Sequence, residues 1–379
     1  MCAAFVAAMA LVSCHKEPVA TQPAQQGEMK AVTVSLSNVG ASLKSSANQT
    51  GDAAALANFN VFFADDAGKV YYGKNPDGTD ATHYSASSAA SMTFHFLDPA
   101  VNKAVVVANM GDLGKGFTLV SEIKAKTVAI ANQQDKDVAT LVMYGESESL
   151  DPTGAHTDTH PSVPVYKAEV EIAPLVARIE VMTFGVSFDE NKFKSVTFET
   201  LAFDNYYTTT TLAGVSGSDP LDGNEFGSLS NDAEGLKTAL KSYFARPENV
   251  GQWYYDNLLV TLNPEQKIVV TSAKTQVSLT DGHRYAYHFF PNKSVTDFTK
   301  NGYPRLCAKV TTENHAGLTK DQYVITGRIL AEGVAFEPGK IYRVNYVFPE
   351  SKLEGDMICA DVEISVKEWD VVTVTPDWN

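Results

Sequence analysis

The chain has 379 residues, of which 44% are hydrophobic and 20% are charged, so it can bury sizeable cores, and two domains are the natural expectation. Its formal net charge of -15 at pH 7 repels phosphate backbones and anionic lipid surfaces. This charge excludes nucleic acid as an expected partner.

The first residues predict export. Residues 3–12 form an apolar run that is too short to span a bilayer but suits the core of a signal peptide. The run ends in Leu11-Val12-Ser13-Cys14, a lipobox, in which small residues let a peptidase reach the bond before a cysteine that carries diacylglycerol. We therefore predict a lipoprotein signal peptide over residues 1–14 and lipidation at Cys14. The alternative is a chance apolar N-terminus.

A tether and a first strand follow. Residues 15–30 are rich in Pro, Gln, Ala and Glu, which predicts a flexible tether. Val32, Val34 and Leu36 then alternate with Thr and Ser, the period of a strand with one buried face. Residues 40–55 are small and polar, which predicts an exposed loop that a protease can enter.

The rest of the first half alternates strands with turns. Further strands are predicted at residues 59–63, 70–72, 92–97 and 103–109. Between Thr118 and Met143 the apolar residues recur at helix-like spacings. These elements predict a mixed or helix-decorated sandwich domain over residues 31–175.

The second half is richer in strands. We place the domain boundary near residue 175, with a second domain over residues 176–356. Many strands with short polar turns predict a β-sandwich. One helix interrupts them, because Leu236, Leu240 and Phe244 repeat every fourth residue and Pro247 follows.

The end of the chain, residues 357–379, predicts a strand appendage. Val362, Ile364 and Val366 share one face, and an apolar stretch from Trp369 to Val374 continues beyond them. An exposed strand edge this apolar aggregates, so it must be paired. It completes either its own sheet or the sheet of a neighbour.

Two cysteines remain for the mature domains. Cys307 and Cys359 form either one disulfide or two buried thiols. The chain has no CxxC motif, so zinc and redox chemistry gain no support.

Catalytic and metal sites are not predicted. His156 and His160 are four residues apart, but the Pro, Gly and Thr around them indicate a loop. Neither acidic turn, residues 75–80 or 218–225, follows the calcium-loop pattern. The familiar hydrolase and metalloprotease motifs are missing as well. We expect no enzyme activity, no cofactor and no bound metal.

The ordered set of motifs resembles the Bacteroidales major fimbrial subunits, the fimbrillins of type V pili. The resemblance covers nearly the whole chain. It is carried by the lipobox at Cys14, the strand at residues 31–38, Lys103 to Gly111, the region 119–143, Val176 to Val181, Gly339 to Tyr346 and the tail from Cys359 to Trp378.

The resemblance implies a fold and a mechanism. The fold would be mainly β with a few helices, as two tandem β-sandwich-like (transthyretin-like) domains with a C-terminal donor strand. Such subunits are exported as lipoproteins, lose their first strand to an arginine- or lysine-specific protease, and accept an extended segment of the next subunit by β-augmentation. Val32, Val34 and Leu36 would be the displaced strand. The donor residues would be Val362, Ile364, Val366, Trp369, Val371 and Val374.

One departure from the family concerns the cleavage site. The first arginine is Arg178, so an arginine-specific cut in the early loop is impossible. Lys44 is the only basic residue between Lys30 and Lys69, and we predict cleavage there. The alternative is that Lys44 is a solvated loop charge and the first strand stays in place, as in an anchoring subunit.

The expected partners follow from this scheme. They are copies of the chain or related fimbrial subunits, outer-membrane lipid through Cys14, a processing protease, and a host or bacterial surface ligand. The expected location is the outer membrane, the cell surface and the fimbrium. The alternatives are an anchor or tip subunit, or a monomeric lipoprotein whose aromatic residues bind surface glycans.

Overall fold

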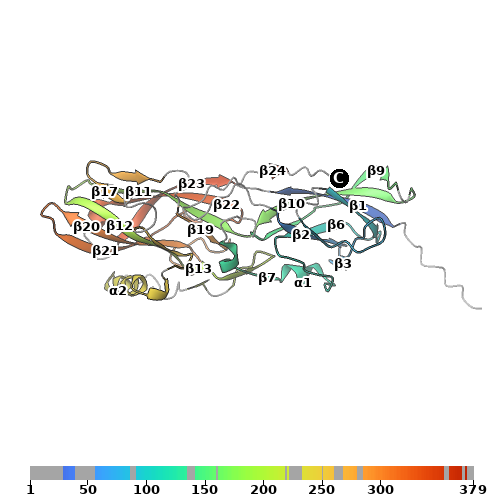
Figure 1. Ribbon diagram of the computed structural model, residues 1–379, viewed down its shortest axis with the longest axis horizontal. Helices are drawn as coiled ribbons and strands as arrows, with labels where there is room; N and C mark the ends of the chain where they lie inside the picture. The colour runs from blue at the N-terminus through green and yellow to red at the C-terminus, as the bar shows by residue number, and fades with distance from the viewer. Residues whose placement is uncertain are drawn as a thin grey trace, which may run out of the picture.

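The computed structural model of the chain is an elongated molecule in which two β-rich halves lie end to end (Figure 1). It describes residues 29–38, 56–85, 91–134, 141–158, 161–217, 220–221, 233–249, 251–259, 268–279, 285–353, 358–368 and 372–373. No helix in these ranges combines the length and the hydropathy needed to cross a membrane. The prediction of a mainly β fold with a few helices is confirmed.

The N-terminal half is built on one continuous sheet. Its strands are β1 (Lys30–Asn38), β2 (Asn58–Ala64), β3 (Val70–Tyr71), β4 (His83–Ser85), β5 (Ser91–Leu97), β6 (Lys103–Ala108), β8 (Met143–Glu146), β9 (Asp151–His156), β10 (Pro164–Pro174) and β24 (Val372–Thr373). The main order is β24-β1-β10-β8-β6-β2-β3, while β4 pairs with β2, β5 with β1 and β9 with β10.

Strand β10 folds this sheet into two layers. Residues 165–172 of β10 pair with β1, whereas Ala173 and Pro174 pair with β8. Apolar side chains of both layers meet in a cluster that we call the N-terminal core. It includes Val32, Val34 and Leu36 of β1, Phe94 of β5, Phe59, Val61 and Phe63 of β2, and Ala168, Val170 and Ile172 of β10.

Strands β2 and β6 are buried on both faces. Val61 points into the N-terminal core, whereas Phe62 and Val105 join a second cluster on the opposite face. The short helix α1 (Val120–Lys124) covers that face with Val120 and Ile123. Burial on two sides explains why these strands read as continuous apolar runs and not as alternating ones.

The C-terminal half repeats the two-layer plan. Its strands are β11 (Ala177–Ser187), β12 (Phe193–Asp204), β16 (Tyr255–Asn257), β17 (Val269–Thr271), β18 (Gln276–Ser278), β19 (Tyr285–Phe289), β20 (Arg305–Asn314), β21 (Thr319–Thr326), β22 (Lys340–Pro349) and β23 (Ile358–Glu368). The order is β16-β12-β20-β21-β23-β22-β11-β18, while β17 pairs with β12 and β19 with β11. Here β23 joins the layers, because residues 358–360 pair with β21 and residues 361–368 pair with β22.

One long helix packs on the C-terminal half. The predicted helix around Leu236, Leu240 and Phe244 is confirmed as α2 (Ala233–Phe244). Leu240 and Tyr243 pack with Ile325 in a small separate cluster beside β21. Figure 1 shows α2 against the outer face of the C-terminal half. Other short elements of this half are β13 (Tyr206–Tyr207), β15 (Pro220–Leu221), η3 (Pro247–Asn249) and η5 (Glu350–Leu353).

The two halves are joined by backbone pairing as well as by packing. Strand β7 (Thr127–Ala129) pairs with β14 (Thr209–Thr211), which belongs to the other half of the sequence. Next to β7, the side chain of Gln134 donates to the His288 carbonyl at 2.8 Å and accepts from the His288 amide at 3.2 Å. The second hydrophobic cluster also continues through this junction. The predicted domain limits therefore stay a prediction, although the sheet changes between β10 and β11.

The helical reading of residues 118–143 is wrong over most of that range. Only α1 and the 3-10 turn η2 (Ile130–Gln133) are helical among its described residues, and β7 lies between them. Strand β8 already begins at Met143. The apolar spacing reflects residues that point into the second cluster from a short helix, a strand and a turn.

Candidate functional site

Strand β1 lies inside its sheet and not at its edge. On one side it runs parallel to β10, with eight register pairs from Ala31↔Val165 to Asn38↔Ile172. On the other side it runs antiparallel to β5, from Lys30↔Leu97 to Ser35↔Ser91. Removing β1 would therefore leave unpaired backbone groups on both neighbours and open a slot between β5 and β10.

The side chains of β1 complete the N-terminal core. Val32, Val34 and Leu36 are 0%, 2% and 6% exposed, as their alternation predicts. On the opposite face, the hydroxyl groups of Thr33 and Thr93 are hydrogen-bonded at 2.8 Å. The strand thus contributes three buried apolar side chains to the N-terminal core, and its opposite face is polar.

Lys30 fixes the start of β1. Its ammonium group donates to the carbonyl of Val101 and lies 5.0 Å from the centre of the Tyr166 ring. Burial lowers the pKa of Lys30, and the nearby charge of Asp98 partly offsets this effect. The strand is therefore held at its first residue by a largely buried basic side chain.

The C-terminal segment reaches the same sheet. Strand β24 pairs with β1 at Ser37↔Thr373 and Asn38↔Val372. This pairing occupies the edge of β1 that β5 leaves after Ser35. In Figure 1, β24 lies over the N-terminal half, far along the molecule from most of β23.

The predicted donor residues are divided between two places. Val362, Ile364 and Val366 belong to β23, which is paired with β22 in the C-terminal half. That pairing is the arrangement expected if the last long strand completes its own sheet. Trp369, Val371 and Val374 lie outside the described residues, as do Cys14 and Lys44. The assignments of the lipid site, the cleavage site and the donor strand stay predictions.

Cys307 and Cys359 cannot be bridged in this fold. Cys307 pairs with Ile325 on one side of β21, and Ile325 pairs with Cys359 on the other. Two strand spacings place the two Cα atoms about 10 Å apart, beyond the roughly 7 Å that a disulfide spans. Cys307 is a free, buried thiol, and its burial raises its pKa well above the ordinary value.

Metal ligation finds no geometric support in the part of the chain that the structure describes. His156 ends strand β9, whose residues are all exposed, and His160 lies outside the described residues. No group of three or more His, Cys, Asp or Glu side chains converges within the described ranges.

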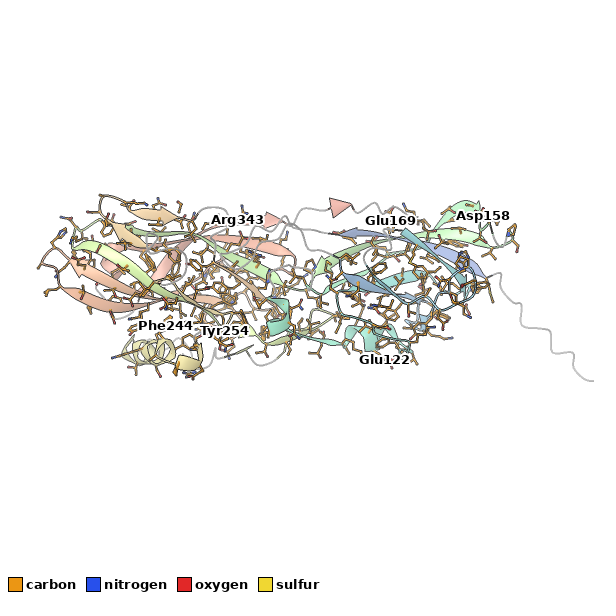
Figure 2. All side chains as sticks on the ribbon, viewed as in Figure 1. Glu122, Asp158, Glu169, Phe244, Tyr254 and Arg343 are labelled. Carbon is orange, nitrogen blue, oxygen red and sulfur yellow. The ribbon has the colours of Figure 1, made fainter. Side chains whose placement is uncertain are left out.

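Sequence reasoning missed a buried charged cluster at the junction. Glu180 of β11 forms an ion pair with Arg178 at 3.1 Å and accepts a hydrogen bond from Arg343 of β22, also at 3.1 Å. Arg178 and Glu180 are 0% and 1% exposed. Burial, together with the nearby charge of Arg178, lowers the pKa of His288 to about 3. Figure 2 shows Arg343 on the C-terminal half, on the side facing the junction. The signal was available, since Arg178 and Glu180 interrupt an otherwise apolar strand.

Comparison with known proteins identifies the fold. No protein-family model matches the chain, and no curated protein matches it. Solved structures match along its length. A fimbrilin from Porphyromonas gingivalis W83 is 13% identical with a TM-score of 0.50, over 90% of this chain and 98% of that chain. A proposed cell adhesion protein from Parabacteroides distasonis ATCC 8503 is 12% identical with a TM-score of 0.50, over 91% and 98%.

These likenesses concern the fold. The chain shares the architecture of fimbrial and cell adhesion proteins of Bacteroidales, and the resemblance expected from its sequence is confirmed at that level.

Proposed function

We propose that the chain is a structural, non-enzymatic subunit of surface fimbriae that polymerises by strand exchange and supports adhesion. The observation that carries this proposal is the position of β1. Strand β1, near the start of the chain, lies between β5 and β10 and buries three apolar side chains in the N-terminal core. The fimbrilin and adhesion neighbours support a fimbrial role.

The slot left by β1 suits a strand of alternating apolar residues. A replacement must pair with β5 and β10 and fill the positions of Val32, Val34 and Leu36. Backbone hydrogen bonds would supply most of the affinity, and the alternating side chains would set the register. In the C-terminal region, Val362, Ile364 and Val366 have this pattern, and the residues beyond them form shorter alternating pairs, Trp369 with Val371 and Val372 with Val374.

The tail beyond β23 is the better donor in this proposal. Residues 361–368 are already paired with β22. If they were donated to a neighbour, the hydrogen bonds between β22 and β23 would be broken. Residues 369–379 follow the ladder, and they include Trp369, Val371 and Val374. The β24 pairs place this part of the chain beside β1 in the single subunit.

Export and processing complete the proposal. Lipidation at Cys14 would hold the precursor at the outer membrane through the tether at residues 15–30. Cleavage at Lys44, in the segment between β1 and β2, would separate β1 from the folded chain. An anchor or tip subunit would differ by keeping β1 or by not donating its tail. A monomeric lipoprotein is the second candidate, favoured by the pairing of β23 within its own half.

The test begins with the chain purified from Lys16 onward. Brief treatment with a lysine-specific protease should produce a new N-terminus at Ser45, followed by a ladder of detergent-resistant multimers on a gel. The Lys44→Ala variant should remain monomeric under the same treatment. Truncation after Glu368 should allow the cut but prevent the ladder.

A control tests whether shortening the chain at its N-terminal end by itself prevents polymerisation. A chain that starts at Met29 lacks the tether but keeps β1, Lys44 and the tail, so it should polymerise like the longer chain. A chain that is cut at Lys44 and stays monomeric with its tail intact would contradict the proposal and favour the monomeric lipoprotein.

A further inference from the structure

A cavity lies where the two halves meet. Its volume is about 770 Å³, within the roughly 300–1,000 Å³ of small-molecule sites. It is lined by residues of β7 and η2, by residues that follow β6 or precede β8, and by the loop before β16. They include Asn109, Thr127, Asn132, Gln133, Gln134 and Trp253. Figure 1 shows β7 near the junction of the halves.

None of the described lining residues has a charged side chain, although the chain has a formal net charge of -15. Its polar groups are amides and one hydroxyl, and its largest side chain is an indole. The lining offers neutral donors and acceptors beside an aromatic face.

Several side-chain amides of the lining form hydrogen bonds with the protein backbone around the cavity. Gln133 Oε1 accepts from the backbone amide of Val142 at 2.7 Å. Gln134 exchanges two hydrogen bonds with the backbone of His288. Asn109 accepts from Ala57 and donates to Leu141. These bonds give η2 and its surroundings a fixed shape, which reduces the cost of ordering the site on binding.

Three polar groups of the lining remain available. Within the described residues, the side-chain amide of Asn132, the hydroxyl group of Thr127 and the indole N–H of Trp253 make no hydrogen bond. Asn132 is exposed on η2, and Trp253 is partly exposed. The indole is held by Tyr206 and Tyr254, at 4.9 Å and 5.3 Å between ring centroids. Figure 2 shows Tyr254 on the C-terminal half, near the junction.

We propose that this cavity binds a neutral carbohydrate, with Trp253 as the face on which a sugar ring packs and Asn132 as a hydrogen-bond partner of its hydroxyl groups. The C–H face of a pyranose is apolar and matches an indole, while its hydroxyl groups are uncharged donors and acceptors that match amides. None of the lining residues belongs to β1, β23 or β24. The site is therefore independent of the proposed strand exchange.

Direct binding to the full chain from Lys16 onward tests the proposal. The probes are N-acetyllactosamine, typical of animal glycoproteins, and maltotriose, typical of storage glucans, and they distinguish two sources of neutral sugar. Saturation-transfer NMR and calorimetry should detect saturable binding of at least one probe. Glucosamine and glucuronic acid, which carry charges, should bind more weakly.

Variants locate the binding. Asn132→Ala should weaken the affinity about tenfold, the effect of one lost hydrogen bond to the ligand. Gln276→Ala removes an exposed amide from β18, which contributes no residue to the cavity lining, and should leave the affinity unchanged. Trp253→Ala should abolish binding, and a melting curve should verify that this variant is folded. If Trp253→Ala is unfolded, the result for Asn132→Ala decides the test. The proposal is overturned if neither neutral probe binds up to about 10 mM, or if Asn132→Ala binds as tightly as the parent chain.

Discussion

Ser37 in the first described strand and Thr373 near the C-terminus are register partners in one antiparallel ladder. The ladder occupies the edge of β1 just beyond its pairing with β5. The two ends of the chain therefore meet on the same sheet of the N-terminal half. In the proposed strand exchange, one of these ends leaves the sheet and a tail of the same sequence replaces it.

Val34 tests the contribution of β1 to the unassembled subunit. Its side chain is 2% exposed in the N-terminal core, so Val34→Ala should lower the free energy of unfolding by about 1–3 kcal/mol. Ser35→Ala, one residue along on the outer face, should change it by less than about 0.5 kcal/mol. Urea denaturation measures both. Equal losses in the two variants would contradict the role of the inward-facing residues.

His288 should make the junction sensitive to acid. Burial and the Arg178 charge lower its pKa to about 3, from an ordinary value near 6.5. As the pH falls below 6.5, the unfolded chain takes up a proton that the folded chain refuses until about pH 3. The stability that neutral His288 provides is therefore present above pH 6.5 and is lost progressively between those two values.

His288→Asn removes this titration and keeps a donor for the Gln133 carbonyl, to which Nδ1 of His288 is hydrogen-bonded at 2.7 Å. Between pH 7.5 and pH 4.5, the parent chain should lose about 2–3 kcal/mol more unfolding free energy than the variant. Urea denaturation at the two pH values measures the difference. Parallel losses in parent and variant would rule out His288 as the source.

A substitution at Gly145 tests how closely β8 packs against β10. A Cβ atom at this position would lie 2.1 Å from the carbonyl oxygen of Glu171, which is backbone and cannot move aside cheaply. Gly145→Ala should therefore cost about 3 kcal/mol or more. Gly116→Ala is the matched control, because nothing lies within 4 Å of its Cβ position. A thermal melt that places both variants near the parent chain would show that the two strands are not so closely packed.

Cys307 should behave as an inert thiol. In a chain from Lys16 onward that carries Cys359→Ala, it is the only cysteine, and burial raises its pKa. Iodoacetamide should label it only after denaturant is added. In the parent chain, intact mass under non-reducing conditions should correspond to two free thiols. A mass lower by two hydrogens would contradict the register that separates Cys307 from Cys359.

The local features of the fold were readable from the sequence. The alternation of Val32, Val34 and Leu36 predicted β1, and the four-residue repeat through Leu240 predicted α2, because each depends on one buried face. The partners of these elements were not readable. Nothing local in β1 specifies a parallel pairing with β10, more than a hundred residues along the chain.

The junction shows the same limit more strongly. Thr127–Ala129 is a strand only because Thr209–Thr211 pairs with it from the other half, and this pairing overrides the helix-like spacing nearby. The described lining of the cavity likewise comes from separate segments, so the cavity cannot be recognised along the sequence. Trp253 gave no local sign that it would line the same cavity as Asn132.

The most direct test of strand exchange is whether the slot of β1 accepts the tail. The chain truncated after Glu368 would be cut at Lys44 and titrated with a fluorescent peptide of residues 369–379, followed by anisotropy. The account predicts saturable binding to the cut chain and much weaker binding to the uncut chain, whose slot is filled by β1. Equal binding to the two, or none to the cut chain, would contradict it.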